Sequence, residues 1–196
     1  GKRILIKPEW EELKEPTDRL VFNVNPGMSF GTGLHETTQL CIEALEDVVK
    51  SGDEILDLGC GSGILSIIAL MLGAKSAYAV DIDPNAVDIA KANAKMNNVD
   101  LESFTAKAGN ILEDSELKNE IAAKKYPVIT ANIVADVIIG MLPFAKSVLG
   151  SGGTLITSGI IEDRIADVED VIKKVGFSDY SVNRRGEWAS IVCKNN

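Results

Sequence analysis

Histidine and cysteine are scarce in this sequence of 196 residues, which holds one histidine, His35, and three cysteines, Cys41, Cys60 and Cys193. The cysteines form no C-x-x-C pair, and their number is odd. A structural zinc site needs several clustered cysteine or histidine ligands, and a disulfide framework needs an even set of cysteines. The sequence therefore argues against a metal site and against disulfides, and a reducing cytoplasm fits it best.

Long apolar runs and excess positive charge are absent as well. The best candidate for a membrane span, Ile64 to Ala74, falls short of the roughly 18 apolar residues that a span requires. Lys and Arg number 20 and Asp and Glu number 29, so the formal net charge is −9. This excess of negative charge argues against a protein that binds naked nucleic acid, for which a basic surface is expected. With 45% hydrophobic and 25% charged residues, the chain reads as one globular domain.

From Glu36 onward, segments with helical spacing of apolar residues alternate with short apolar segments typical of strands. This alternation predicts an α/β fold, with a parallel sheet covered by helices on both faces. The expected strands are 54–58, 76–80, 101–106, 128–131 and 154–158, and the expected helices are 64–72, 85–96, 113–124, 134–148 and 164–175, after a first helix that begins at Glu36. Residues 177–183 and 188–193 predict a C-terminal antiparallel hairpin. Short strands are expected within 3–10 and at 20–24.

The most informative segment, EILDLGCGSGILSI, spans Glu54 to Ile67. A strand runs into three spaced glycines, which permit a tight turn and a close approach of a ligand to the backbone. The helix that follows favours an anion at its N-terminus. A dinucleotide site would read G-x-G-x-x-G, whereas this segment reads D-x-G-x-G-x-G. The shifted third glycine and the preceding Asp57 fit a ligand with a single carboxylate better than a pyrophosphate.

Asp81 ends the next strand, in the segment AVDIDP. An acid at the carboxyl end of this strand can accept hydrogen bonds from a ribose diol. The alternative is a structural turn in which Asp81 or Asp83 caps the following helix. The glycine loop and Asp81 together, within one βαβ unit, favour the ligand-binding interpretation.

This unit resembles the class I S-adenosylmethionine (SAM) methyltransferases. The resemblance implies a Rossmann-like, seven-stranded sheet, with Gly59 and Gly61 facing the methionine portion of SAM and Asp81 holding its ribose. Asn110, in AGNI after the third strand of the unit, is the candidate for the adenine contact. Many relatives have Asp there, and a turn residue explains Asn110 equally well.

A second segment, NPGMSFGTGLHETTQL, spans Asn25 to Leu40. A glycine-rich loop leads into a helix whose first turn has two hydroxyls, and hydroxyls and free helix N–H groups can bind a carboxylate. An equally weighted alternative is that Thr37 or Thr38 only caps the helix and binds no ligand. His35 is a proton acceptor or a structural group, and a structural role is more common for a lone histidine. The candidate cofactor contacts in this segment are Phe30, Gly31, Thr32 and Thr38.

A third segment, ITANIVADVI, places Asn132 at the end of the fourth strand of the sheet, where a polar side chain faces the ligand crevice. Amino methyltransferases often carry Asn-Pro-Pro-aromatic here, and only the Asn matches. Asn132 is therefore the candidate catalytic residue, orienting an amine through its side-chain oxygen, and a candidate SAM contact. Trp188 either lines the substrate entrance or packs the hairpin. Cys60 has no visible base beside it and is not expected to act as a nucleophile.

Taken together, the sequence resembles the PrmA family of ribosomal protein methyltransferases. The matching pieces are PGMSFGTGLHETT, LDLGCGSGILSI, AVDIDP, ANIVAD, SGII and GEW. The resemblance implies SAM-dependent N-methylation of amines, namely lysine side chains and an N-terminal amine, of large-subunit ribosomal protein eleven. It also implies SAM contacts at Thr38, Gly59, Asp81 and Asn132. We further expect a cytoplasmic monomer with no membrane contact and no direct contact with nucleic acid.

Two departures from the family pattern stand out. This chain reads His-Glu-Thr-Thr where the family has His-Pro-Thr-Thr, but the first turn of a helix tolerates both Pro and Glu. The family also has an N-terminal domain that recognises the substrate, and this chain begins near the linker expected to follow it. We expect residues 1–24 to form a linker with short strands and residues 25–196 to form the catalytic domain.

Other functions remain open at this point. One alternative is a methyltransferase that acts on RNA or on a small molecule, and another is a SAM-binding module without catalysis. A nicotinamide-dependent dehydrogenase conflicts with the spacing of the glycines.

Overall fold

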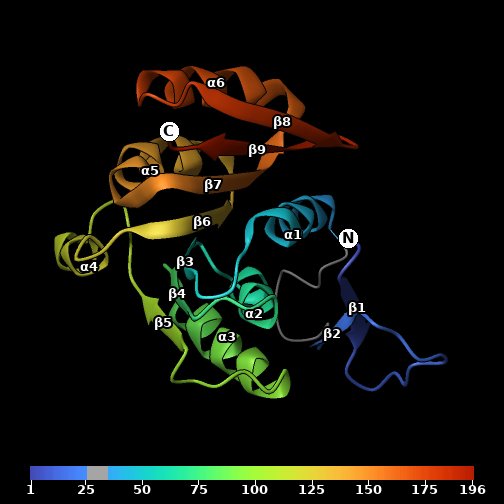
Figure 1. The fold of residues 1–196 in the computed structure, drawn as a ribbon. Coiled ribbons are helices and arrows are strands. Elements are labelled where there is room, and N and C mark those ends of the chain that lie inside the picture. The colour runs from blue at the N-terminus through green and yellow to red at the C-terminus, as the bar shows by residue number, and fades with distance from the viewer. Residues whose placement is uncertain (26–34) are drawn as a thin grey trace.

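The computed structural model describes residues 1–25 and 35–196, so the candidate contacts Phe30, Gly31 and Thr32 lie outside the described residues. A seven-stranded sheet organises the chain (Figure 1), in the order β5-β4-β3-β6-β7-β9-β8. The five strands from β5 to β7 pair in parallel, and β9 runs antiparallel to both β7 and β8. The predicted α/β fold with a C-terminal antiparallel hairpin is confirmed.

The strands of this sheet are β3 (Glu54–Leu58), β4 (Ser76–Asp81), β5 (Phe104–Ala108), β6 (Tyr126–Asn132), β7 (Leu149–Ile161), β8 (Asp179–Arg185) and β9 (Trp188–Lys194). The helices are α1 (Glu36–Val48), α2 (Ile64–Met71), α3 (Pro84–Met96), α4 (Ser115–Ile121), α5 (Ala135–Val148) and α6 (Ile165–Lys174), with a short 3-10 turn η1 (Glu162–Arg164) before α6. Within the described ranges, no helix combines the length and apolar character that crossing a membrane requires.

Two apolar layers hold the sheet between the helices. Side chains alternate along a strand, so neighbouring residues of β3 enter different layers. Ile55 joins the layer beneath α1, α2 and α3, whereas Leu56 joins the layer beneath α4, α5 and α6. Both side chains are fully buried. The sheet is therefore covered on both faces, as the uncharged strand centres predicted.

Two N-terminal strands, β1 (Ile4–Pro8) and β2 (Leu20–Val24), form a separate parallel pair beside the main sheet (Figure 1). Phe22 is buried in the same apolar layer as α2 and α3. Asn23 and Asn97 exchange two hydrogen bonds, of 2.7 and 3.0 Å, which tie β2 to the C-terminal end of α3. Residues 1–24 are thus packed against the main body through β2.

The strand order reverses next to β3. The chain moves outward from β3 to β4 and β5, and then returns to the other side of β3 as β6. In open α/β sheets, such a reversal opens a crevice at the carboxyl ends of the strands, where ligands bind. The glycine loop leaves β3 at this point, and Asn132 ends β6 beside it.

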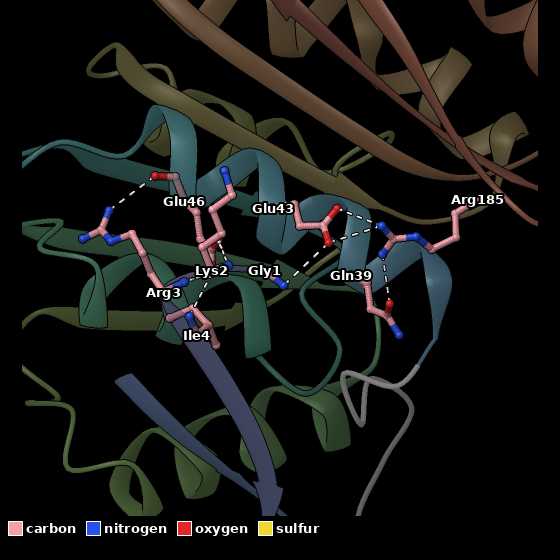
Figure 2. Close-up of polar contacts among 8 residues, drawn as sticks. All are labelled: Gly1, Lys2, Arg3, Ile4, Gln39, Glu43, Glu46 and Arg185. Carbon is pink, nitrogen blue, oxygen red and sulfur yellow. Dashed lines mark hydrogen bonds and ion pairs between the residues drawn. The ribbon is translucent and has the colours of Figure 1, made fainter. Parts of the chain in front are cut away.

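The outer face of α1 holds the first residues of the chain (Figure 2). The Glu46 carboxylate accepts hydrogen bonds from the backbone N–H groups of Lys2, Arg3 and Ile4, at 2.6, 2.9 and 2.9 Å. Partial burial raises the pKa of Glu46, but the three N–H donors outweigh it, so the net pKa lies below its ordinary value. The charged form of Glu46 is thus the form that the fold favours.

We expect Glu46→Gln to lower the free energy of unfolding by about 1 kcal/mol at neutral pH, because an amide is a weaker acceptor than a carboxylate. A carboxylate with a lowered pKa stabilises the fold above its unfolded pKa and loses this contribution as pH falls through its folded value. The gap between variant and wild type should therefore close as the pH drops below 4.5, the ordinary value for Glu46. Urea unfolding at several pH values measures this gap. Asp47→Asn, at an exposed neighbour, is the control and should show no such trend.

Candidate active site

Helix α1 begins with a histidine cap at the edge of the crevice. The Nδ1 atom of His35 accepts a hydrogen bond from the backbone N–H of Thr37 at 3.3 Å and lies 2.9 Å from the Thr37 hydroxyl. The cap of α1 is therefore His35, and neither Thr37 nor Thr38 performs that role. Since Nδ1 acts as the acceptor, the ring proton of neutral His35 sits on Nε2.

Asn132 faces Thr38 across the crevice. The Asn132 Nδ2 atom donates a hydrogen bond to Thr38 Oγ1 at 3.3 Å, and the Thr38 side chain is buried. In this arrangement the Asn132 Nδ2 atom faces Thr38. The Oδ1 atom, which is the acceptor of the amide, accepts no hydrogen bond from residues 1–25 or 35–196 and is available to a ligand.

The glycine loop is held by backbone contacts from β4 and by one side chain from α3. The N–H groups of Gly59 and Cys60 both donate to the Val80 carbonyl, at 2.8 and 2.9 Å. Asn93 of α3, which is buried, donates from Nδ2 to the Ser62 carbonyl at 2.9 Å. This last contact was not predicted, since nothing in the sequence of the helix marks Asn93 as facing the loop.

Gly59 shows why the loop needs glycine. Its φ is +76°, in the left-handed region, and an added Cβ would lie 2.9 Å from the Ile133 Cδ1 atom. The backbone of the loop therefore runs close to the side chain that follows Asn132. Glycine permits both the conformation and the contact.

Asp81 joins the end of β4 to the glycine loop. Its carboxylate accepts hydrogen bonds from the N–H of Gly61 at 2.8 Å and of Asp83 at 3.0 Å. The cap of α3 is supplied by Asp83, whose Oδ1 atom accepts from the N–H of Asn85 at 2.9 Å. Each Asp81 oxygen has one such partner and retains acceptor capacity for further donors.

Asp57 is a buried acid beneath the loop. Its side chain is 1% exposed and accepts hydrogen bonds from the hydroxyls of Ser66 and Thr130, both at 2.7 Å. Burial raises the pKa of Asp57, while the two hydroxyl donors partly offset that effect. These contacts tie the end of β3 to α2 and to β6, and so hold the glycine loop beside the end of β6.

The crevice contains a pocket of about 270 Å³ that brings together four residues predicted from the sequence, Thr38, Gly59, Gly61 and Asn132. The rest of its lining is His35, Thr37, Cys60, Ser62, Ile64, Leu65, Ile133, Val134, Gly159 and Trp188. Asp81 is not part of this lining. Its carboxylate accepts a hydrogen bond from the N–H of Gly61, and Gly61 does line the pocket.

Asn110 also lies outside the pocket lining. Its Oδ1 atom accepts a hydrogen bond from the N–H of Leu112 at 3.0 Å, so it stabilises a turn after β5. The N–H of the preceding residue, Gly109, donates to the Asp81 carbonyl at 2.8 Å. The structure therefore gives Asn110 a turn function and places its backbone near Asp81.

An aromatic pair closes one side of the pocket. The rings of His35 and Trp188 meet edge to face, with centroids 5.0 Å apart and an interplanar angle of 68°. Ile133 and the exposed Val134, which the sequence did not single out, also line the pocket. Cys60 is buried, and burial followed by the charges of Asp57 and Asp81 raises its pKa, so its thiol stays protonated and is a poor nucleophile.

Gly159, in the segment SGII, packs closely against the backbone of Ile133. Its φ is +86°, and an added Cβ would lie 2.5 Å from the Ile133 carbonyl oxygen. The N–H of Ile133 in turn donates to the Ser158 carbonyl at 3.0 Å. The end of β7 thus supports the backbone that carries Asn132 and Ile133.

Comparison with known proteins gives concordant results for sequence and structure. A family model described as Ribosomal protein L11 methyltransferase (PrmA) matches residues 1–196. The Ribosomal protein L11 methyltransferase of Agathobacter rectalis is 44% identical over 195 residues, covering 97% of this chain and 60% of that protein. The chain spans about 60% of the length of the curated relatives that it matches.

Two solved structures share the fold. The ribosomal protein L11 methylase of Lactobacillus delbrueckii subsp. bulgaricus superposes with a TM-score of 0.88 at 29% identity, covering 100% of this chain and 96% of that one. A SAM-dependent O-methyltransferase of Thermotoga maritima has a TM-score of 0.67 at 15% identity, covering 79% and 64% of the two chains, and shows the fold alone. Because the family model matches residues 1–196 and the relatives align with nearly all of this chain, the chain belongs to the PrmA family of ribosomal protein L11 methyltransferases.

Proposed function

We propose that this chain is the catalytic part of a SAM-dependent N-methyltransferase that methylates amines of ribosomal protein L11, namely lysine side chains and the N-terminal amine. The observation that carries this proposal is the orientation of Asn132. Its Nδ2 atom donates to Thr38, and its Oδ1 atom accepts no hydrogen bond from the described residues, in the pocket that the glycine loop lines. Membership of the PrmA family supports the same substrate.

The residues around the crevice fit SAM. The glycine loop leads into the N-terminus of α2, and a helix N-terminus favours an anion such as the methionine carboxylate. Gly59 lines the pocket without a side chain, which allows a ligand to approach the backbone closely. Asp81 is held in place by two N–H donors and keeps acceptor capacity for the ribose hydroxyls. Asn110 would lie at the adenine end, and Thr38 and Asn132 at the reacting end.

SAM supplies a methyl group on a positively charged sulfonium. The residues of the chain must keep the amine neutral and orient it. A lysine amine has a pKa of about 10.4 and is mostly protonated at neutral pH, so the site must favour its neutral form. The apolar groups of Ile133, Val134 and Trp188 withdraw the amine from water, which lowers its pKa. Asn132 Oδ1 then accepts one amine hydrogen and directs the nitrogen lone pair along the line of attack.

Positioning of the amine against the methyl group accounts for the rate of methyl transfer, so the proposed mechanism needs no strong base. Holding two reactants in line removes a large part of the barrier. His35 uses Nδ1 to cap α1, so a proton accepted there would break the cap. We therefore propose a structural role for His35, together with its ring contact to Trp188.

The division of the chain and its partners belong to the same proposal. We take residues 25–196 as the catalytic domain and residues 1–24 as a linker with two short strands. A net charge of −9 suits a basic ribosomal protein as partner. We also propose a cytoplasmic location, which a ribosomal substrate and three free, buried cysteines support.

We expect Asp81→Ala to raise the Kd for SAM about 10- to 100-fold, since hydrogen bonds to a charged group contribute about 1.5–3 kcal/mol. The variant also removes the acceptor of the Gly61 N–H and so loosens the loop. Calorimetric titration of SAM measures the change. Asp83→Ala is the matched control, because it removes the α3 cap and costs stability without touching the ribose position. Equal affinity of Asp81→Ala and wild type would refute the assignment.

The proposed function is tested by binding and by transfer. The chain should bind SAM and should show no comparable affinity for NAD in the same titration. With labelled SAM and the full-length enzyme, label should appear in purified L11 and not in ribosomal RNA or in free amino acids, and the 196-residue chain alone should transfer it poorly. Label in RNA would indicate the RNA-methyltransferase alternative, and SAM binding without label in any acceptor would indicate a binding module.

A further inference from the structure

The turn of the C-terminal hairpin is attached to α1 by two contacts. One is the ring contact between Trp188 and His35 described above. The other comes from Arg185, the last residue of β8, which pairs with Trp188 across the turn at Gly186 and Glu187. Directly paired residues of antiparallel strands point to the same side of a ladder. Arg185 and Trp188 therefore face α1 together.

The Arg185 guanidinium bridges two successive turns of α1, as Figure 2 shows. Its Nη1 atom donates to Gln39 Oε1 at 2.9 Å, and its Nη2 atom donates to Glu43 Oε1 and Oε2 at 3.2 and 3.0 Å. Gln39 lies one turn after the cap, since its N–H donates to the His35 carbonyl. The planar fork of arginine can hold both acceptors at once, which a lysine ammonium at the end of a flexible chain cannot match.

We propose that Arg185 is a positioning residue: it holds the hairpin turn on α1 so that Trp188 stands at the wall of the pocket. This inference rests on the function proposed above, because Trp188 matters only if an amine enters that pocket. Arg185 itself is absent from the pocket lining and acts through Trp188. Of the residues proposed to hold SAM, Gly59, Gly61 and Asp81 lie in the glycine loop and on β4, whereas Thr38 lies on α1 next to Gln39.

The contact between Arg185 and α1 should affect the position of Trp188 more than the stability of the fold. The side chains of Arg185 and Glu43 are 36% and 39% exposed, and exposed ion pairs contribute little to folding. Removing the guanidinium should therefore leave the melting temperature and SAM binding nearly unchanged. The effect should fall on the position of Trp188 and on the methyl-transfer step.

The test compares Arg185→Gln with Arg184→Gln, which changes an exposed neighbour on the opposite side of β8. The chain has two tryptophans, and Trp10 is 67% exposed, so all variants carry Trp10→Phe to isolate the emission of Trp188. Acrylamide quenching reports how well Trp188 is shielded. SAM titration and methyl transfer to L11 at saturating SAM are measured on the same samples.

For Arg185→Gln we expect stronger quenching of Trp188, an unchanged Kd for SAM and a fall of about tenfold in the transfer rate, because small misplacements at a site cost large factors in rate. Arg184→Gln should behave as the parent chain, and Arg185→Lys should recover only part of the loss. Should Arg185→Gln fail to fold, Glu43→Gln replaces it, and the same changes are expected at smaller amplitude.

The proposal is overturned if Arg185→Gln and Arg184→Gln show equal quenching and equal rates. It is also overturned if Arg185→Gln lowers the melting temperature and the affinity for SAM together, since that pattern marks a general loss of structure. If the full-length enzyme transfers no methyl group, the proposed function fails, and the quenching data still decide whether Arg185 positions Trp188.

Discussion

Asn132→Ala is expected to slow methyl transfer to L11 about 100-fold or more, the usual loss when one oriented polar group is removed from a reacting centre. The affinity for SAM should change far less. The Asn132 side chain has one hydrogen bond within the described part of the chain, to Thr38, and the loop that would carry the methionine portion is held separately by Val80 and Asn93. Rapid single-turnover measurement with SAM and L11 separates the transfer step from binding.

Thr38 offers a matched pair of variants for this prediction. Thr38→Val removes the hydroxyl that fixes the Asn132 amide, and Thr38→Ser retains it. The valine variant should lose part of the rate, and the serine variant should keep most of it. An Asn132→Ala chain that transfers methyl groups as fast as wild type would remove Asn132 from the mechanism.

Gly159→Ala is expected to cost about 3–4 kcal/mol of stability, which for a chain of this size lowers the melting temperature by about 10 °C. Two penalties add together. The φ of +86° is unfavourable for any residue with a Cβ, at about 1–2 kcal/mol. The new Cβ would also lie 2.5 Å from the Ile133 carbonyl oxygen and 2.9 Å from its carbon, and backbone atoms cannot rotate away.

Gly152→Ala isolates the first of these penalties. Gly152 lies in the same strand, β7, with a φ of +70°, and an added Cβ there has no neighbour within 4 Å. It should cost only about 1–2 kcal/mol, from the backbone conformation alone. Because Ile133 must move to admit the Cβ of the Gly159 variant, that variant should also lose transfer activity at temperatures where it is still folded. Equal stability of the two variants would show that the close approach to Ile133 carries no cost.

The parts of the fold that follow from sequence periodicity were predicted well. Strand β2 occupies residues 20–24 and β3 residues 54–58, as predicted, because apolar residues there are bounded by clear turn signals. Strand β5 was predicted at residues 101–106 but spans Phe104–Ala108. The reason is Asp100, whose side chain and carbonyl accept bonds from Glu102 and Ser103 and turn the chain before the strand begins.

Helix α4 shows the same kind of error. It was predicted at residues 113–124 and spans Ser115–Ile121. Asp114 caps it by accepting a hydrogen bond from the N–H of Leu117 at 2.9 Å, which delays the start of the helix. In both places a local side-chain bond to the backbone decided the boundary, and apolar spacing does not reveal such a bond.

The candidate site divides in a similar way. Thr38, Gly59, Gly61 and Asn132 were predicted because the ends of parallel strands and the starts of helices converge at one edge of the sheet. The supports of that site were not predicted. Asn93 reaches the glycine loop, Gly159 touches Ile133 and Arg185 bridges two turns of α1, and each of these contacts joins distant segments that only the folded chain brings together.

Site-resolved mass spectrometry of L11 after incubation with the full-length enzyme and SAM tests the central claim most directly. We expect added methyl groups on nitrogen, at lysine side chains and the N-terminal amine, and we expect their number to fall sharply when Asn132→Ala replaces the wild type. Methyl groups on carboxylate or hydroxyl oxygens, or unmodified L11 beside a full-length enzyme that binds SAM, would contradict the account.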